Sequence, residues 1–379
     1  MSGRLSMVNA RELRLFLGVL SALAVAFGAS AALAQLVTNH GAVKITRMAS
    51  DLDEPWAIGF LPGRAVVITE RGGALHYFDG QGRRHQVAGV PPVFAEGQGG
   101  LLDVVPARDF SLSRRLFFTY AMPDGRGGKT ALAHARLSED TKRLVDWTVI
   151  YALKRADRGG RHFGSRVVEA RDGTLYLTIG DRGDRDQAQN PATALGAVVR
   201  VNPDGSLPRD MPDFGASAAP GLWSIGHRNP QGAAMDAKGR IWVVEHGPRG
   251  GDEVNRLRRG ANFGWPLIGY GTHYSGAKVG VGTHKLGLEQ PEYYWDPSIA
   301  PSGMMIYQGK MFPDWRGDMF VGSLKFDYIA RLRPEDGKLA EVEQITAPET
   351  GRVRDLREAP DGSIWFLSVA DGAAYRMSR

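Results

Sequence analysis

The sequence predicts an all-β protein, a six-bladed β-propeller, and three observations carry this prediction. Glycine supplies 49 of 379 residues, about 13% against a usual share of roughly 7%. Another 21 residues are proline, and a chain that turns this often favours many short strands over long helices. The third observation is a unit of three short strands that recurs six times. Units of this size that cannot bury both faces alone are typical of propeller blades.

Each copy of the unit contains an apolar strand, a turn, a second strand rich in β-branched or aromatic residues, and a third alternating strand. In most copies the turn contains glycine, as in RDG at 171–173 and PDG at 360–362, whereas the second copy has SRR at 113–115. The predicted second strands are 65–69, 116–120, 174–179, 240–245, 319–323 and 363–368. The predicted third strands are 74–78, 130–137, 196–201, 252–257, 328–333 and 373–377. A β-sandwich with regular turns is the alternative, but a sandwich has no reason to repeat.

The first 34 residues are predicted to be a secretory signal peptide. Three arginines, at positions 4, 11 and 14, precede an apolar run over 15–29, and Ala32-Leu33-Ala34 forms a cleavage motif. The alternative is an uncleaved anchor, but the run is shorter than the roughly 20 residues that a membrane span needs. Cleavage after Ala34 leaves 35–379 as one propeller catalytic domain, exported and, in a bacterium, periplasmic, with no membrane span.

Composition excludes several classes of function. The chain has no cysteine, which excludes disulfides, thiolate metal sites and cysteine nucleophiles. Its formal charge of +6 is spread along the sequence, so no nucleic-acid partner is expected.

The propeller geometry predicts that many polar residues meet at one mouth. In each blade the innermost strand and its neighbour run antiparallel, so the residues before the first and after the second lie at the same end. His162 and Asp181 flank one such hairpin, at 165–179. The other residues predicted at this mouth are Gln98, Arg228, Asn229, Gln231, 246–248, Lys325, Arg352 and Arg354. A mouth with this many polar groups is typical of a functional site.

Four cations at the mouth, Arg228, Lys325, Arg352 and Arg354, indicate an anionic ligand. They would repel one another unless a polyanion lay between them, and arginine forks fit carboxylates or phosphates. Each alone could instead form a surface ion pair. His162 with Asp181 is typical of a general base oriented by a carboxylate, although a hydrogen-bonded loop histidine is the simpler alternative.

The run EHGPRGGDE at 245–253 places backbone carbonyls in a tight turn beside carboxylates. Oxygen-rich turns suit Ca²⁺, although acidic glycine turns are also common on surfaces. His246 has no histidine four residues later, which argues against zinc.

Together these motifs resemble the PQQ-dependent soluble aldose sugar dehydrogenases of the glucose/sorbosone dehydrogenase family. The stretches that carry the resemblance include EGQGGLLD (96–103), GRHFGSRVV (160–168), SIGHRNPQG (224–232), EHGPRGGDEVN (245–255), NFGWP (262–266), HYSG (273–276), SLK (323–325) and GRVRD (351–355). They cover essentially all of the chain after residue 34. The resemblance implies a six-bladed propeller that oxidises the anomeric C1 hydroxyl of aldoses to lactones, with transfer of a hydride to PQQ.

The resemblance also implies residue roles. His162 corresponds to the base that removes the hydroxyl proton, and Asp181 to its orienting partner. The residues matched to PQQ binding are Gln98, His162, Arg228, Asn229, Gln231, Tyr274, Lys325, Asp327, Arg352 and Arg354. The carbonyls of Gly247 and Pro248 match ligands of a catalytic calcium, while Glu253 and the Phe263 carbonyl match a second, structural calcium.

Substrate contacts are expected from Gln98 and Trp295, the latter as a platform for a sugar face or, equally, as a blade-core aromatic. Arg161 stands where the family's glucose enzyme has an acidic residue, and the long insertions of that enzyme have no room here. We therefore expect broad aldose specificity. The electron acceptor, for example a periplasmic cytochrome or a quinone, is not identified by the sequence.

Two other functions are compatible with a propeller of this kind. A calcium-dependent lactonase would need carboxylate and amide side chains on an axial calcium, whereas the predicted rim is cationic. A non-catalytic binding propeller would not need His162 and Asp181.

Overall fold

The structure, a computed structural model, describes residues 35–335 and 337–379. The predicted signal peptide at 1–34 lies outside the described residues. No helix in the described part has the length and apolar character needed to cross a membrane. Its single α-helix is α1 (Phe110–Ser113), and nearly all other regular structure is antiparallel sheet.

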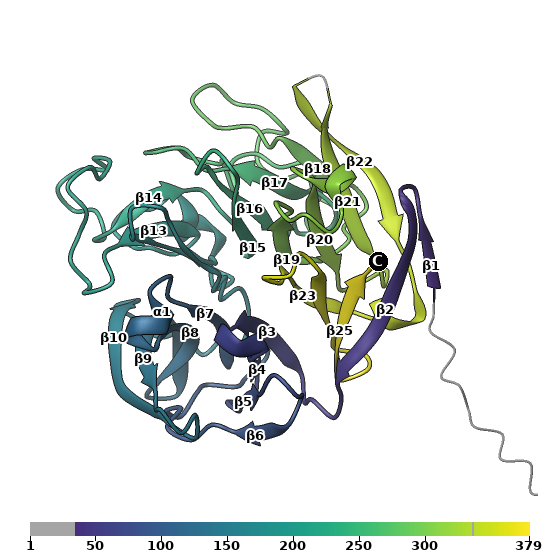
Figure 1. Ribbon diagram of the computed structural model, residues 1–379. Helices are drawn as coiled ribbons and strands as arrows, with labels where there is room; N and C mark the ends of the chain where they lie inside the picture. The colour runs from purple at the N-terminus through teal and green to yellow at the C-terminus, as the bar shows by residue number, and fades with distance from the viewer. Residues whose placement is uncertain (1–34, 336) are drawn as a thin grey trace, which may run out of the picture. The chain divides into compact units, whose positions relative to one another are not determined.

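Six separate sheets form the blades, as Figure 1 shows. The first contains β3 (Pro55–Phe60), β4 (Val66–Glu70), β5 (Leu75–Phe78) and β6 (Arg84–Gln86). The second contains β7 (Leu101–Pro106), β8 (Arg115–Asp124), β9 (Gly127–Leu137) and β10 (Leu144–Ala152). The third contains β11 (Val167–Glu169), β12 (Leu175–Ile179), β13 (Ala197–Val201) and β14 (Leu222–Ile225).

The remaining blades follow the same order from the inside outward. The fourth contains β15 (Pro230–Met235), β16 (Ile241–Glu245), β17 (Asp252–Arg256) and β18 (Tyr293–Trp295). The fifth contains β19 (Pro301–Ile306), β20 (Met319–Ser323), β21 (Ile329–Glu335) and β22 (Lys338–Ile345). The sixth contains β23 (Val353–Glu358), β24 (Ile364–Ser368) and β25 (Ala373–Ser378), to which β2 (Gly41–Ala49) and β1 (Gln35–Thr38) are added.

The prediction of a six-bladed propeller is confirmed. The six predicted second strands correspond to β4, β8, β12, β16, β20 and β24, and the third strands to β5, β9, β13, β17, β21 and β25. Because the sheets are six and separate, the sandwich alternative is wrong.

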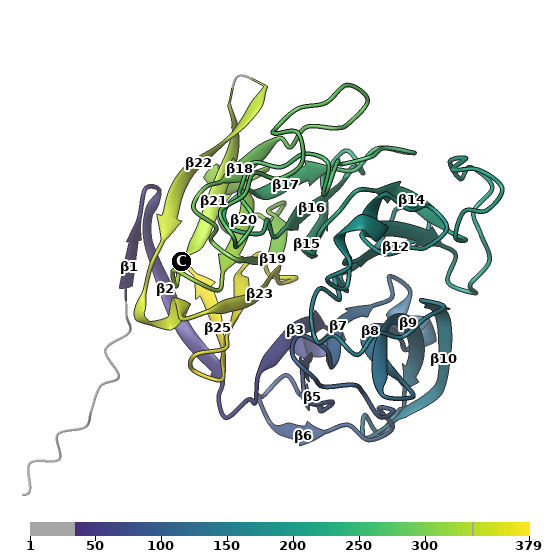
Figure 2. The same ribbon diagram turned by 180° about the vertical axis from the view of Figure 1, so that it is seen from behind.

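The sequence prediction missed β1 and β2, which belong to no repeat of their own. β2 pairs with the last strand, β25, with Lys44 opposite Ser378, and β1 pairs with β2, so the sixth blade combines both ends of the described chain. Figure 2 shows β1 and β2 beside β25 from the opposite side. An amphipathic strand that completes another blade carries no local turn signal, because its partner is more than 300 residues away.

Hydroxyl groups join the inner parts of neighbouring blades. Thr69 Oγ1 donates to the Leu102 carbonyl at 2.6 Å, and Thr119 Oγ1 to the Ser165 carbonyl at 2.6 Å. Thr178 Oγ1 makes the equivalent bond to Pro230 at 3.1 Å. Each threonine lies on the second strand of its blade and is buried, so the bonds fix the spacing of successive inner strands.

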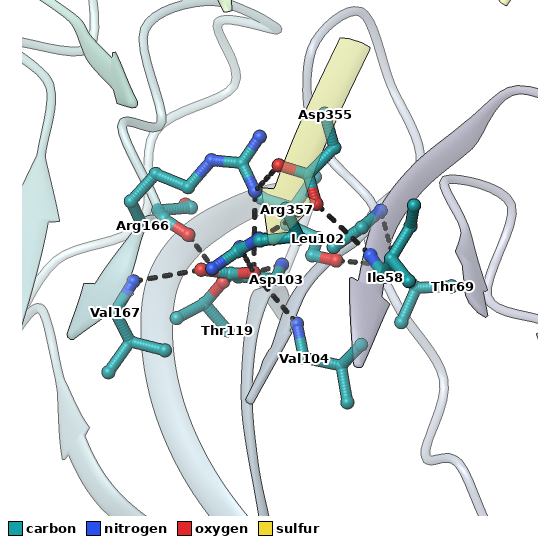
Figure 3. A network of polar contacts seen from close by, with 12 residues as sticks. Ile58, Thr69, Leu102, Asp103, Val104, Thr119, Arg166, Val167, Asp355 and Arg357 are labelled. Carbon is teal, nitrogen blue, oxygen red and sulfur yellow. Dashed lines mark hydrogen bonds and ion pairs between the residues drawn. The ribbon is translucent and has the colours of Figure 1, made fainter. Parts of the chain in front are cut away.

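A buried cluster of two aspartates and two arginines fills the axis of the propeller (Figure 3). We call Asp103, Arg166, Asp355 and Arg357 the axial cluster. Asp355 Oδ2 of β23 accepts the Ile58 backbone N–H of β3 at 3.0 Å, which joins the last blade to the first. Arg357 bonds both aspartates, at 2.7 Å to Asp103 and 3.1 Å to Asp355. The charges balance, as burial requires.

We predict that Thr119→Val destabilises the protein although it preserves shape. The hydroxyl donates to Ser165 O and accepts the Asp103 backbone N–H at 2.9 Å, so valine leaves two buried polar groups unpaired. The expected cost is about 1–3 kcal/mol for each group, measured as a lower free energy of unfolding in urea. Thr148→Val, at an exposed position, is the control and should change it by less than about 0.5 kcal/mol. Equal effects of the two substitutions would contradict the role assigned to this hydroxyl.

Candidate active site

The loops at one end of the propeller bring His162 and Asp181 together. The two side chains share a hydrogen bond of 2.6 Å between His162 Nδ1 and Asp181 Oδ1. Asp181 is almost fully buried, and its other oxygen accepts Trp265 Nε1–H at 2.8 Å. Gly183 N–H donates to Oδ1 at 2.7 Å. With Nδ1 bound to the carboxylate, the Nε2 atom of the neutral ring is left as the acceptor.

The surroundings favour ionised Asp181 and neutral His162. Burial alone would raise the pKa of Asp181, but hydrogen bonds from His162, Gly183 and Trp265 lower it below its ordinary value. Burial lowers the pKa of His162, helped by the charges of Arg228 and Arg161 and opposed by Asp181. The pair therefore has the protonation states that a general base requires.

Backbone geometry explains why glycines surround this histidine. His162 has a φ of 54°, in the left-handed region that side chains rarely adopt. A Cβ at Gly180 would lie 2.1 Å from the His162 carbonyl. The close approach of the two loops is therefore possible only with glycine at position 180.

Amide side chains connect the histidine to the propeller axis. Gln98 Oε1 accepts the His162 backbone N–H at 2.8 Å and the Asn229 Nδ2–H at 3.5 Å. Gln231 Nε2 donates to Asn229 Oδ1 at 3.2 Å, and Gln231 Oε1 accepts Arg354 Nη1–H at 3.1 Å. Gln98, Asn229, Gln231 and Arg354 thus form one connected group with His162, from four different blades or their connections.

Arg354 is a partly buried cation that has no carboxylate partner among the described residues. Its side chain donates to the neutral Gln231 amide, and no Asp or Glu of the described residues forms an ion pair with it. Desolvation, together with the charges of Arg166 and Arg352, lowers its pKa to about 9. A buried charge normally has a partner, so this environment favours binding of an anion.

Arg228 lies on the other side of the histidine. Its Nη1–H groups donate to the Gly247 carbonyl at 2.8 Å and the His246 carbonyl at 3.2 Å. The guanidinium carbon is 5.4 Å from the centre of the Trp265 ring. Glu245 Oε2 accepts the Arg228 backbone N–H at 2.7 Å, which fixes the start of β15.

Lys325, Asp327 and Arg352 form a second polar group beside Arg354. Asp327 Oδ1 accepts the Arg352 backbone N–H at 2.8 Å, and Arg352 Nη1–H donates to the Leu324 carbonyl at 3.0 Å. Lys325 is exposed, and its Nζ lies 4.7 Å from the centre of the Phe326 ring. The residues come from the turns after β20 and before β23, as the mouth geometry predicts.

Tyr274 and Trp295 lie outside this connected set. Tyr274 is 75% exposed on a loop whose neighbour His273 packs 6.2 Å from the Trp265 ring. Trp295 is 6% exposed on the outermost strand of the fourth blade, where it packs with Ile299 and Tyr328 in the core between blades four and five. Of the two alternatives expected for Trp295, the structure therefore favours the blade-core aromatic over the sugar platform.

The residues expected to bind calcium offer oxygen atoms at two places, around Gly247 and around Glu253. The Gly247 carbonyl already faces a cation, the Arg228 guanidinium, so an oxygen cradle for positive charge exists there beside Pro248. Desolvation, together with the negative charge of Glu245, raises the pKa of Glu253 to about 8. Asn255 Oδ1, on the same strand as Glu253, is buried without a hydrogen-bond partner. Paired carboxylates beside an unpaired amide oxygen fit a cation, to which the Phe263 carbonyl could contribute.

Side chains alone do not form a metal centre in residues 35–335 and 337–379, where no three His, Cys, Asp or Glu residues converge to bind an ion. Any calcium site would therefore need backbone or amide oxygens in addition to a carboxylate such as that of Glu253.

Sequence reasoning missed three residues that hold this site. Trp265 orients Asp181, Glu245 holds the Arg228 backbone, and Arg166 bonds the carbonyls of Gln231 at 2.7 Å and Arg354 at 3.2 Å. Trp265 lies within the NFGWP motif, which was its only signal. The contacts of Arg166 join strands far apart in sequence and leave no local pattern.

Comparison with known proteins assigns the chain to a family. The family model for glucose/sorbosone dehydrogenase matches residues 52–376. The chain belongs to the glucose/sorbosone dehydrogenase family. As a member of that family it is an oxidoreductase.

Several relatives are similar to this chain over most of its length. Aldose sugar dehydrogenase YliI of Escherichia coli (strain K12) is 40% identical over 334 residues, which cover 86% of this chain and 90% of that protein. Quinoprotein glucose dehydrogenase B of Acinetobacter calcoaceticus is 26% identical, with 84% and 83% covered. The crystal structure of soluble aldose sugar dehydrogenase from Escherichia coli in its apo-form has a TM-score of 0.84 at 37% identity, covering 89% of this chain and 99% of that one.

We predict that in His246→Gln the free energy of unfolding falls less steeply than in the wild type as the pH decreases below 6. His246 Nε2 bonds the Pro301 carbonyl at 2.6 Å, and burial lowers the pKa of this ring to about 3. The folded state thus prefers neutral His246, whose stabilising effect is complete above about pH 6.5 and is lost as pH falls toward 3. The stability gap between wild type and variant should close by up to about 1.4 kcal/mol per pH unit below pH 6.

Urea unfolding between pH 7.5 and 4.5 measures this gap. The control is His284→Gln on an exposed loop, which should run parallel to the wild type. A constant gap between wild type and His246→Gln would contradict the prediction.

Proposed function

We propose that this protein is a PQQ- and Ca²⁺-dependent dehydrogenase that oxidises the anomeric C1 hydroxyl of aldose sugars to lactones. The observation that carries the proposal is Arg354, a partly buried cation that forms no ion pair with a carboxylate of the described residues and lies in one hydrogen-bonded group with the His162–Asp181 pair. A small anion with several carboxylates, next to a neutral base, is what this site suits best.

PQQ, a tricarboxylate, fits the charge and the amides of this mouth. Arg354, Arg352, Lys325 and Arg228 would bind its carboxylates, since arginine pairs with carboxylates through two parallel bonds. Gln98, Asn229 and Gln231 offer amide donors and acceptors, while Asp327 would hold Arg352 and exposed Tyr274 would border the ligand. When bound, PQQ would supply the acceptor for the hydride that leaves C1. The name of the quinoprotein relative from Acinetobacter agrees with this proposal.

Calcium would be held by the carbonyls of Gly247 and Pro248, and a second ion by Glu253 with the Phe263 carbonyl. The unpaired Asn255 oxygen and the raised pKa of Glu253 support a cation at the second position. At the first position a bound cation would compete with Arg228 for the Gly247 carbonyl, which would free the guanidinium for an anion.

His162 would remove the proton from the C1 hydroxyl through Nε2. Asp181 keeps the proton of the neutral ring on Nδ1 and stabilises the imidazolium formed when Nε2 accepts a second proton. Trp265 and Gly183 fix the carboxylate, so the ring is oriented before a sugar binds. Since the pKa of His162 is lowered, the ring is neutral and competent at neutral pH.

The sugar would enter a broad mouth bordered by exposed Arg161 and the amide of Gln98. We propose that aldose specificity is broad, as the sequence leads us to expect. We further propose that 35–379 is the exported catalytic domain, that 1–34 directs export to the periplasm, and that a separate redox partner accepts the electrons.

The decisive experiment is reconstitution. We predict that purified protein reduces an artificial dye with aldoses only when PQQ and Ca²⁺ are both added, because the cations need the anionic cofactor and the carbonyl cradle needs the metal. Dye reduction with glucose and with a disaccharide is the measurement, and EDTA-treated protein without PQQ is the control. Equal activity with NAD and no PQQ would refute the proposal.

We predict that His162→Gln binds PQQ and Ca²⁺ but loses about 10²–10⁴-fold in turnover, the usual contribution of a general base. Asp181 cannot replace the ring, because a carboxylate of ordinary pKa near 3.9 is a weak base at neutral pH. Stopped-flow absorbance after mixing the PQQ-loaded variant with an aldose measures the step. The control is His284→Gln, at an exposed position away from the His162–Asp181 pair. Wild-type rates in His162→Gln would show that the base lies elsewhere.

A further inference from the structure

One side chain, Arg166, hydrogen-bonds the backbone carbonyls of two residues proposed to bind the cofactor. Arg166 is 1% exposed on the propeller axis. Its Nε–H donates to the Gln231 carbonyl at 2.7 Å, and its Nη2–H donates to the Arg354 carbonyl at 3.2 Å. Gln231 and Arg354 are themselves bonded through their side chains at 3.1 Å. Arg166 therefore ties together the backbones of a pair that meets above it.

The opposite edge of the same guanidinium is anchored by the axial cluster. Nη1 lies 3.0 Å from Asp355 Oδ1 and 3.4 Å from Asp103 Oδ1, and Figure 3 shows Arg166 reaching these aspartates. The guanidinium carbon lies 4.1 Å from the centre of the Trp56 ring. Two carboxylates and an aromatic face thus fix the plane of the group, and that plane fixes where its other two donors point.

We propose that Arg166 is a positioning residue for the cofactor site: it sets the place of Arg354 and Gln231, and with them the affinity for PQQ. The inference rests on the proposed function. Arg354 lacks a carboxylate partner of its own, so its position relative to an anionic ligand depends on its backbone and on Gln231. Through Gln231 the effect extends to Asn229, whose Oδ1 accepts the Gln231 amide at 3.2 Å.

Only arginine fits this role. The four acceptors lie around a planar fork that has five N–H donors in fixed directions. Lysine has the same charge but a single nitrogen. That nitrogen could bond the aspartates or one of the two carbonyls, but it could not bond all four acceptors. Arg166→Lys therefore keeps the positive charge in the axial cluster but removes the guanidinium hydrogen bonds that position Gln231 and Arg354.

The structure provides a matched control in Arg357. This arginine bonds the same two aspartates, at 2.7 Å and 3.1 Å, but its side chain donates no hydrogen bond to Gln231 or Arg354 among the described residues. Arg357→Gln should therefore lower stability, as removal of one partner from a buried ion cluster does, without moving the cofactor residues.

The test is titration of PQQ into Ca²⁺-loaded protein, followed by cofactor absorbance and protein fluorescence, with urea unfolding measured in parallel. We expect the Kd for PQQ to rise about 10- to 100-fold in Arg166→Lys and Arg166→Gln, the usual effect of losing a group that orients a ligand's contacts. Arg357→Gln should keep the Kd within about twofold of wild type although it unfolds at lower urea.

Other outcomes overturn the inference. Wild-type affinity in the Arg166 variants would assign Arg166 to stability alone, and so would an equal rise of Kd in Arg357→Gln. Failure of both Arg166 variants to fold while Arg357→Gln folds and binds PQQ would also make the role purely structural. If wild-type protein does not bind PQQ at all, the proposed function fails first and this inference with it.

Discussion

A ring of blades around an axis brings inner strands so close that the axis must be filled, and the axial cluster fills it with charge. Asp103 and Asp355 accept backbone N–H groups from Val167 and Ile58 at 3.0 Å each, while Arg166 and Arg357 neutralise them. One partner removed would leave a charge buried in low dielectric, which is strongly unfavourable. The cluster therefore holds the first, second, third and sixth blades in a fixed relation.

That fixed relation is what makes the mouth above it a site. His162 follows the second blade, Asp181 the second strand of the third, Arg228 begins the fourth and Arg354 belongs to the sixth. These residues come from different blades, so the distances between them depend on how the blades are placed relative to one another. The buried threonine bonds between neighbours and the pairing of β2 with β25 fix that placement.

Electrostatics divides the axis into two levels. At the lower level two arginines meet two aspartates and the charge is balanced. At the upper level Arg354 has an amide in place of a carboxylate, and burial together with Arg166 and Arg352 lowers its pKa. The same type of side chain thus stabilises the fold below and leaves capacity for an anion above, because only the upper level lacks counter-charge.

The sequence by itself determined the all-β class, the count of six blades and the end of the propeller where polar residues collect. These follow from local signals: glycine turns set strand ends, and alternation of antiparallel strands sets which loops share a face. His162 and Asp181 could be paired in this way because they flank one hairpin.

Tertiary structure decided the rest. Whether Trp295 faces a sugar or a blade core depends on the neighbouring blade, which buries it against Tyr328 and Ile299. The strands β1 and β2 belong to a blade only because β2 pairs with β25 at the far end of the chain. Arg166 and Trp265 gain their roles from partners 63 to 188 residues away. Contacts at such separations have no periodicity along the chain, so only the closed ring of blades reveals them.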